Sequence, residues 1–223
     1  MQQKKLILFA VPLFCFGLTK LPAQTVKDID GNVYTSVTIG TQVWMVENLK
    51  TTKYRNGDLI GTTTTATLDI SLETTPKYQW AYDGNESNVN TYGRLYTWYA
   101  VMDSRNVCPT GWHVPSDAEW TALTKYLGGK RVAGGKLKEI GTTHWLNPNT
   151  GATNETGFTA LPSGGRSNYG SYYTIGYFGI WWSSTESSTL DAYLRRLTYD
   201  TRKVYRNSGY KLSGFSIRCL KDN

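Results

Sequence analysis

The sequence predicts an α+β protein in which one antiparallel sheet joins both ends of the chain and a single disulfide closes the fold. Alternating apolar residues indicate strands near both ends, whereas helical periodicity is confined to the middle of the chain. After a predicted signal peptide only two cysteines remain, Cys108 and Cys219, so an exported chain has one intramolecular pairing to form. Long irregular connections are expected between these elements.

Residues 1–23 have the pattern of a secretory signal peptide. Two lysines precede an apolar run at residues 6–18, and the small residue Ala23 ends the segment. The run is too short to span a bilayer comfortably, so we expect no membrane insertion after cleavage. Cys15 lies inside this run instead of following a small residue at the cleavage point, which argues against a lipid anchor. The mature chain, 24–223, is expected to form a single domain.

The charge balance gives little support to nucleic-acid binding. The chain has 24 Lys and Arg against 17 Asp and Glu, and the signal peptide removes three lysines and no acid, which leaves 21 against 17. One modest basic cluster remains, at Arg195, Arg196, Arg202, Lys203 and Arg206. We interpret it as a solvated strand face and expect no nucleic-acid partner.

The first half of the mature chain begins with strands. Alternation at 33–39 followed by Gly40 and an apolar run at 43–46 predicts a β-hairpin. The Thr-rich segment 61–77 and the Asp/Asn/Gly-rich segment 82–91 are expected to be loops.

Two helices are predicted in the middle. Leu95, Trp98, Tyr99 and Met102 have the spacing of an amphipathic stripe. The second helix is expected at 117–127, because a Ser-x-x-Glu capping box precedes it and two glycines follow it. Residues 134–141 are expected to hold one more short helical turn.

The last part of the chain is expected to be loop and strand. A Gly/Tyr/Ser-rich stretch at 163–177 precedes three short candidate strands at 178–184, 192–198 and 215–220. We expect the following tryptophans to lie in the core, with at least one of the last two buried: Trp44, Trp98, Trp112, Trp120, Trp181 and Trp182.

Five ordered segments resemble a known family, the Fibrobacter succinogenes major paralogous domain. They are 39–49 (IGTQVWMVENL), 92–98 (YGRLYTW), 108–120 (CPTGWHVPSDAEW), 182–185 (WSST) and 214–219 (GFSIRC). The resemblance covers about residues 26–222, essentially the whole mature chain. The family occurs in exported proteins of Bacteroidetes and Fibrobacteres and has no established activity. It therefore implies secretion to the cell surface or periplasm of a Gram-negative bacterium.

A more distant similarity is to the formylglycine-generating enzyme branch of the C-type lectin-like fold. It rests on 114–120, the late aromatic-Ser-Ser-Thr segment and the closing Gly-Phe-Ser-Ile-Arg. This resemblance implies a C-type lectin-like architecture, with helices beside an antiparallel sheet closed by both termini. The copper chemistry of those enzymes needs a nearby pair of thiols. Cys219 has no neighbouring cysteine in the sequence, so that activity does not carry over.

No catalytic constellation is visible, and we expect a protein that is not an enzyme. The histidines His113 and His144 come with no third ligand at metal spacing, and no Gly-x-Ser-x-Gly elbow is present. The carboxylates considered for sugar hydrolysis are Asp103, Asp117, Glu119 and Asp191. Asp117 and Glu119 are already explained as residues of the first helical turn.

Calcium is the one cofactor that the sequence suggests. Asp28, Asp30 and Asn32 alternate in one loop, and Asp83, Asn85 and Asn88 lie close together in another. Neither loop has the length or the terminal Glu of an EF-hand. Ordinary turn formation is the alternative for both.

The stretch 163–177 is the main candidate for function, because Tyr, Ser, Gly and Asn also dominate recognition loops. The candidate ligand-binding residues are Arg166, Asn168, Tyr169, Tyr172, Tyr173 and Tyr177, with Tyr205, Arg206, Asn207 and Tyr210 as a second group. Tyrosine rings would stack on the ligand, while Arg and Asn would donate hydrogen bonds. The alternative is a Gly-rich connection whose tyrosines cover the core.

The expected function is therefore a secreted or cell-surface binding module that recognises a carbohydrate or a surface protein. One alternative is a structural or assembly subunit of a surface appendage. A second is a divergent hydrolase or oxidase. The sequence leaves open the ligand and the oligomeric state.

Overall fold

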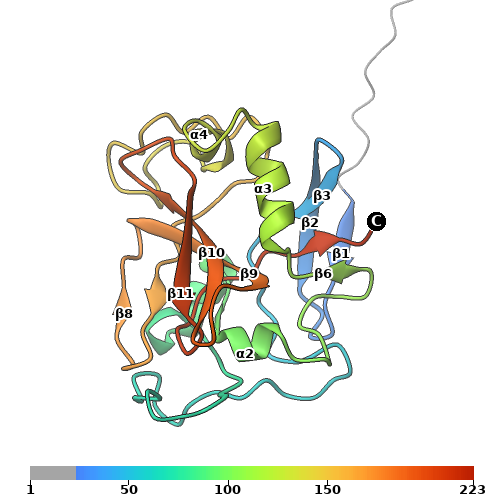
Figure 1. Ribbon diagram of the computed structural model, residues 1–223, viewed down its shortest axis with the longest axis vertical. Coiled ribbons are helices and arrows are strands. Elements are labelled where there is room, and N and C mark those ends of the chain that lie inside the picture. Colours follow the sequence, from blue (N-terminus) through green and yellow to red (C-terminus); the bar gives the residue numbers. More distant parts are fainter. Residues whose placement is uncertain (1–23) are drawn as a thin grey trace, which may run out of the picture.

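A computed structural model describes residues 24–223 of the protein (Figure 1). The predicted signal peptide lies outside the described residues. The structure is mixed α/β, with antiparallel sheets, a few short helices and one disulfide. Among the helices of residues 24–223, none is both long enough and apolar enough to cross a bilayer.

The first sheet joins the two ends of the described chain. Its strands, in spatial order, are β1 (Thr25–Lys27), β2 (Val33–Ile39), β3 (Gln42–Met45), β12 (Leu220–Lys221) and β6 (Trp112–His113), all antiparallel. The predicted hairpin is confirmed, because β2 and β3 pair around a turn where Gly40 has a φ of 64°. Leu220 pairs with both Trp44 and His113. The two ends therefore meet in one sheet, as the sequence predicts.

The second sheet is built from the last third of the chain. It has the order β11–β10–β9, with β9 at Phe178–Glu186, β10 at Asp191–Thr198 and β11 at Tyr205–Tyr210. The predicted strands at 178–184 and 192–198 are confirmed. β11 is a strand that the sequence does not predict, because Tyr-Arg-Asn-Ser-Gly-Tyr has no apolar alternation. It forms as an edge strand that pairs with β10 alone.

Two short ladders complete the β structure. β4 (Gln79–Trp80) pairs with β5 (Leu95–Tyr96), and β7 (Gly165–Arg166) pairs with β8 (Tyr172–Tyr173). The second ladder lies within the Tyr-rich stretch at 163–177, so part of this predicted loop is a hairpin.

Of the two main helices predicted, only the second is formed at its predicted length. α3 spans Asp117–Tyr126, and its capping box is present: the Glu119 amide donates to Ser116 Oγ at 3.2 Å and the Ser116 amide donates to Glu119 Oε2 at 2.7 Å. α2 is a single turn at Trp98–Val101. The predicted stripe is wrong at its start, because Leu95 belongs to β5 and pairs with Trp80.

Four further short helical segments occur in the described chain. α1 spans Val89–Tyr92, and α4 spans Ala133–Leu137 in the region where a short helical turn is expected. Two 3₁₀ turns, Tyr82–Gly84 and Glu86–Asn88, precede α1.

The segment 211–220 is buried throughout and connects the two sheets. It forms a regular strand only at Leu220–Lys221, not over the whole of the predicted 215–220. Upstream it makes single bridges: Phe215 exchanges backbone hydrogen bonds with Tyr96, and Ser216 accepts one from the Trp182 amide and donates one to Ile180. The end of the chain therefore serves as a central connector of the fold.

The core lies on both faces of the second sheet. Ile180, Trp182 and Leu194 belong to one apolar cluster, and Trp181 and Leu197 belong to the other. α3 lies against the second sheet on the side of the second cluster (Figure 1). In that cluster the Trp120 ring lies 4.6 Å from that of Trp44 and 6.4 Å from that of Trp181. All six tryptophans expected in the core are buried: Trp44, Trp98, Trp112, Trp120, Trp181 and Trp182.

The predicted disulfide is formed between Cys108 and Cys219, 111 positions apart in the chain. Both cysteines lie in the apolar cluster on the side of Ile180 and Trp182. The bond ties the chain just before β6 to the residue just before β12, and these two strands are neighbours in the first sheet.

Candidate functional site

Arg166 is the residue around which the Tyr-rich stretch is built. Its side chain is fully buried, and its guanidinium donates to the carbonyls of Ala66 at 3.0 Å and Leu68 at 2.5 Å, and to that of Ser167 at 3.0 Å. Burial lowers the pKa of Arg166. A buried guanidinium needs an acceptor for most of its five N–H groups, and here carbonyl oxygens supply them. Arg166 therefore joins the Thr-rich segment to the Tyr-rich one.

Two aromatic side chains support this connection. The guanidinium of Arg166 lies 4.0 Å from the centre of the Trp80 ring, and the Tyr172 hydroxyl donates to the same Ala66 carbonyl at 3.1 Å. The Trp80 indole donates to Thr63 Oγ1 at 2.9 Å. Stacking of a cation on an indole adds to the hydrogen bonds, so the contact is rigid.

The two backbones also touch directly. The Ile70 amide donates to the Asn168 carbonyl at 2.8 Å. Gly170 has a φ of 90°, and a Cβ placed on it would lie 2.0 Å from the Thr67 carbonyl oxygen, so only glycine fits there. We call residues 66–70 and 166–172 together the clamped loop pair.

The clamped loop pair presents apolar groups to solvent. Tyr169 is 67 % exposed and Leu68 is 42 % exposed, and both sit on backbone that the contacts above hold in place. Asn168 is half-buried beside them, and Ser171 is exposed. A large ring on a fixed backbone can bind a flat apolar surface without losing much conformational entropy.

Three of the predicted ligand-binding residues make contacts within the protein. Arg166 and Tyr172 form the clamp described above. Tyr173, on the opposite side of β8, packs against the core beside Phe215, and burial raises its pKa to about 12. Arg166 is fully enclosed, so its assignment as a ligand-binding residue is corrected: it positions the loop that carries Tyr169.

Tyr177 lies beyond the hairpin. It remains 46 % exposed and contacts Tyr199, with the ring centres 5.4 Å apart.

The second predicted group is divided by the geometry of β11. Side chains alternate along a strand, so Tyr205 and Asn207 lie on the same face of β11. Arg196 of β10 is paired with Tyr205 and lies on this face too. The Arg196 guanidinium lies 5.1 Å from the centre of the Tyr205 ring. Arg206 and Tyr210 point to the other face, and there Arg206 contacts Asp117 of α3. The structure therefore does not bring all ten candidate residues into one surface.

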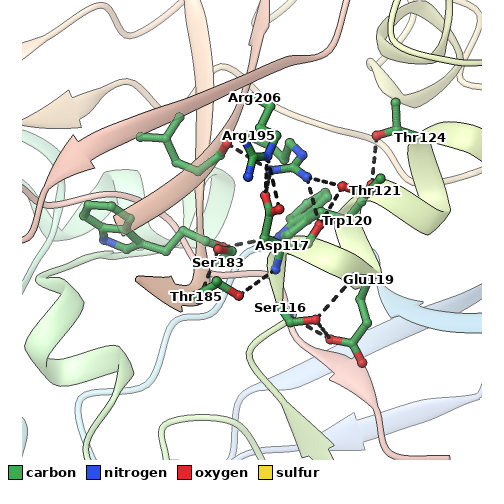
Figure 2. Close-up of polar contacts among 12 residues, drawn as sticks. Ser116, Asp117, Glu119, Trp120, Thr121, Thr124, Ser183, Thr185, Arg195 and Arg206 are labelled. Carbon is green, nitrogen blue, oxygen red and sulfur yellow. Dashed lines mark hydrogen bonds and ion pairs between the residues drawn. The ribbon is translucent and has the colours of Figure 1, made fainter. Parts of the chain in front are cut away.

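Arg206 belongs to an ion-pair network that the sequence does not predict (Figure 2). Arg195, opposite Arg206 in the register, donates to Asp117 Oδ1 at 2.7 Å and to Thr121 Oγ1 at 2.9 Å. Arg206 Nε donates to the same carboxylate at 2.9 and 3.1 Å. The available signal was the basic cluster at 195–206, but it is the register of β10 with β11 that places Arg195 opposite Arg206 on one face.

The residues weighed for catalysis all have protein partners. Asp103 pairs with Arg105 and Lys77, each at 2.8 Å, and Asp191 accepts from Ser188 at 3.1 Å. His144 contacts Glu139 at 2.9 Å. Between residues 24 and 223, no three His, Cys, Asp or Glu side chains converge in the manner of a metal site.

The two loops considered for calcium contain turn contacts. Asp28 accepts from the Asn32 amide at 2.9 Å and from the Tyr34 hydroxyl at 2.6 Å. Asp30 accepts from Thr52 and pairs with Lys53 at 3.1 Å. In the other loop, Asn85 caps a 3₁₀ turn. The carboxylates of the first loop already have donors within the protein.

Comparison with known proteins places the chain in a family without assigning an activity. The model of the Fibrobacter succinogenes major domain matches residues 37–221. No curated protein and no solved structure matches the chain. The matched range contains the turn of the β2–β3 hairpin, α3, the second sheet and both cysteines of the disulfide. The chain belongs to the Fibrobacter succinogenes major domain family.

Proposed function

We propose that the protein is a secreted or cell-surface binding module that recognises a glycan or a surface protein through the clamped loop pair. The observation that carries the proposal is Tyr169, a largely exposed aromatic ring on backbone held by Arg166, Gly170 and the Ile70 amide. Rigid aromatic side chains on surface loops are frequent binding elements.

The proposed chemistry is reversible stacking. The ring of Tyr169 would lie on the apolar face of a sugar or on an apolar side chain, and Leu68 would extend this contact. Asn168 and Ser171 would provide hydrogen bonds at the edge. No bond is broken in this proposal, and it needs no cofactor.

The proposed architecture is C-type lectin-like. It is supported by the terminal strands sharing one sheet and by the disulfide beside them. Export to the surface or periplasm of a Gram-negative bacterium is proposed from the leader pattern and from a disulfide that needs an oxidising compartment.

The test is Tyr169→Ala, with Tyr126→Ala as a matched control. Both tyrosines are 67 % exposed, but Tyr126 lies at the end of α3, where its ring contacts Gly40. The mature protein and both variants are applied to a glycan array and to bacterial cell surfaces. Tyr169→Ala should weaken binding about tenfold or more, because exposed aromatic anchors dominate binding energies. Tyr126→Ala should bind as the unchanged protein does.

Three results would count against the proposal. One is unchanged binding by Tyr169→Ala, and another is equal loss in both variants. The third is an oligomer that Tyr169→Ala dissociates, measured by light scattering, with no ligand bound by either form. That result would favour the assembly subunit.

A further inference from the structure

A hollow between α3 and β11 has an unusual charge pattern. Its volume is about 270 Å³, and four of its eight lining residues are basic while none is acidic. The basic residues are Lys125, Lys130, Arg195 and Arg206. Four other hollows on the described surface each include an acidic side chain, for example Asp28 beside Lys27 or Glu86 beside Arg94. The α3–β11 hollow therefore favours an anion.

The positive charge of this hollow is only partly balanced. The single carboxylate of Asp117 serves both Arg195 and Arg206 (Figure 2). Arg206 contacts it through Nε, and its half-exposed guanidinium also stacks on Tyr193, 3.7 Å from the centre of that ring. Within the described part of the chain, no carboxylate lies within ion-pair distance of Lys125 or Lys130. The two lysines are therefore available to an incoming anion, and Arg206 adds a positive charge that Asp117 shares with Arg195.

The walls of the hollow are fixed by backbone contacts. The Val204 amide donates to the Lys130 carbonyl at 2.8 Å, which closes one end. The pairs with Asp117 hold two other lining side chains, Arg195 and Arg206, in place. The Thr124 hydroxyl donates to the Trp120 carbonyl at 2.8 Å, and this bond fixes the side chain of another lining residue. The hollow is therefore preformed, and Val204 is the one aliphatic side chain among its lining residues.

We propose that the α3–β11 hollow binds one acidic sugar residue, in which a carboxylate or a sulfate meets Lys125, Lys130 and Arg206 while the apolar face of the ring covers Val204. A volume just below the usual range for small-molecule sites suits a single sugar ring. A nucleic acid would need a longer basic track than these three cations provide. This site is separate from the clamped loop pair and does not depend on the function proposed there.

Binding is measured by calorimetry on the mature protein. The probes are an oligogalacturonate, a sulfated dextran oligosaccharide, a neutral oligosaccharide of equal length, inorganic phosphate and a short single-stranded DNA. One or both acidic sugars should bind, and binding should weaken as salt is raised. The neutral sugar, phosphate and DNA should bind at least about tenfold more weakly.

The site is located by Lys125→Gln with Lys130→Gln, compared with Lys27→Gln with Lys221→Gln. The second pair lies on β1 and β12 and changes the net charge by the same amount. The first double variant should lose about tenfold or more in affinity for the acidic sugar, with an unchanged melting temperature because both lysines are exposed. The second should bind normally.

Each other outcome overturns the inference. The inference is wrong if neither acidic sugar binds. It is also wrong if both double variants lose affinity equally, because that result would show a general effect of net charge. Equal affinity for phosphate or DNA would show that a sugar is not recognised. Tyr169→Ala should leave this binding intact, so failure here and failure of the loop-pair proposal are distinguishable.

Discussion

At the scale of single residues, three buried cations hold irregular backbone in place. Arg166 donates to three carbonyls of two loops, as described above. Lys138 Nζ donates to the carbonyls of Thr150, Thr198 and Thr201 at 3.0–3.1 Å. Arg218 donates to the Phe158 carbonyl and to Asn48 Oδ1. Long loops have backbone acceptors that no ladder satisfies, and these side chains supply the donors.

His113 joins three parts of the fold through two carboxylates. Its Nε2 lies 3.0 Å from Glu119 Oε1, in the capping box of α3, and its Nδ1 lies 2.6 Å from Asp222 Oδ1, beyond the last strand. Burial opposes protonation of the ring, but the two carboxylates outweigh it and raise the pKa of His113 above its usual value. The protonated imidazole donates to both carboxylates.

We predict that His113→Gln destabilises the protein mainly in mildly acidic solution. A group whose pKa is raised on folding stabilises fully below its unfolded pKa of about 6.5, and this contribution is lost as pH rises through the folded value. The free energy of unfolding, from urea titrations, should therefore differ more between variant and unchanged protein near pH 5.5 than near pH 9. A difference that is constant or grows with pH would contradict the pairing.

At the scale of elements, Asp117 connects the start of α3 to the second sheet. Its carboxylate lies in the first turn, where it also interacts favourably with the helix dipole. Its partner Arg195 is almost fully buried, whereas Arg206 is half-exposed. Burial works to raise the pKa of Asp117, but the hydrogen bonds from Arg206 and Arg195 outweigh it and lower the pKa.

We predict that Asp117→Asn costs about 3 kcal/mol of stability at neutral pH, because it leaves the buried charge of Arg195 without a carboxylate. Arg206→Gln removes an exposed partner of the same carboxylate and should cost at most about 1 kcal/mol. Urea unfolding of both variants checks this order. The cost of Asp117→Asn should shrink as pH falls from the usual aspartate pKa through the lower pKa of folded Asp117, because the unfolded chain is protonated first and the native carboxylate only at the end of this range. Equal costs for the two variants would contradict the assignment of Arg195 as the main partner.

Elements with local signals could be predicted from the sequence, and elements made by distant contacts could not. α3 has its capping box within four residues, and the 33–46 hairpin has its alternation and turn in one stretch. α2 is shorter than predicted because Leu95 is drawn into pairing with Trp80. β11 has no strand pattern of its own and depends on β10.

The candidate site shows the same limit. Composition predicts the stretch 163–177 as a candidate binding loop. It cannot tell Tyr169 from Tyr173, because both are tyrosines in the same Gly/Tyr/Ser-rich sequence. Only the fold separates them, with Tyr169 exposed and Tyr173 packed on the core. The clamp of Arg166 joins residues 98 to 100 positions apart, which no local pattern could indicate.

At the scale of the whole molecule, the disulfide constrains the largest loop in the fold. Cys108 and Cys219 close 111 positions, which include α3, the clamped half 166–172, the second sheet and the α3–β11 hollow. The segment just before Cys219 contacts both sheets. The cross-link therefore limits how far the unfolded chain can expand, while the folded chain already holds the two cysteines together.

We predict that Cys108→Ala with Cys219→Ala lowers the free energy of unfolding by up to about 5 kcal/mol, the value that loop-closure entropy gives for a loop of this length. Alanine is chosen because both sites are buried and a serine hydroxyl there would need a hydrogen-bond partner. Guanidinium unfolding of the oxidised protein and the double variant measures the difference. The variant should also show a steeper dependence on denaturant, because its unfolded chain exposes more surface.

The dependence of the unfolding free energy on denaturant distinguishes two causes of lost stability, a more expanded unfolded chain and altered packing in the folded one. If the cross-link acts on the unfolded chain, adding a reductant to the unchanged protein should reproduce both the lower stability and the steeper slope of the double variant. If the loss came from altered packing around the two alanines, the slope would stay that of the oxidised protein. Equal stability of oxidised and reduced protein would show that the buried segment 211–220 holds the sheets together without help from the disulfide.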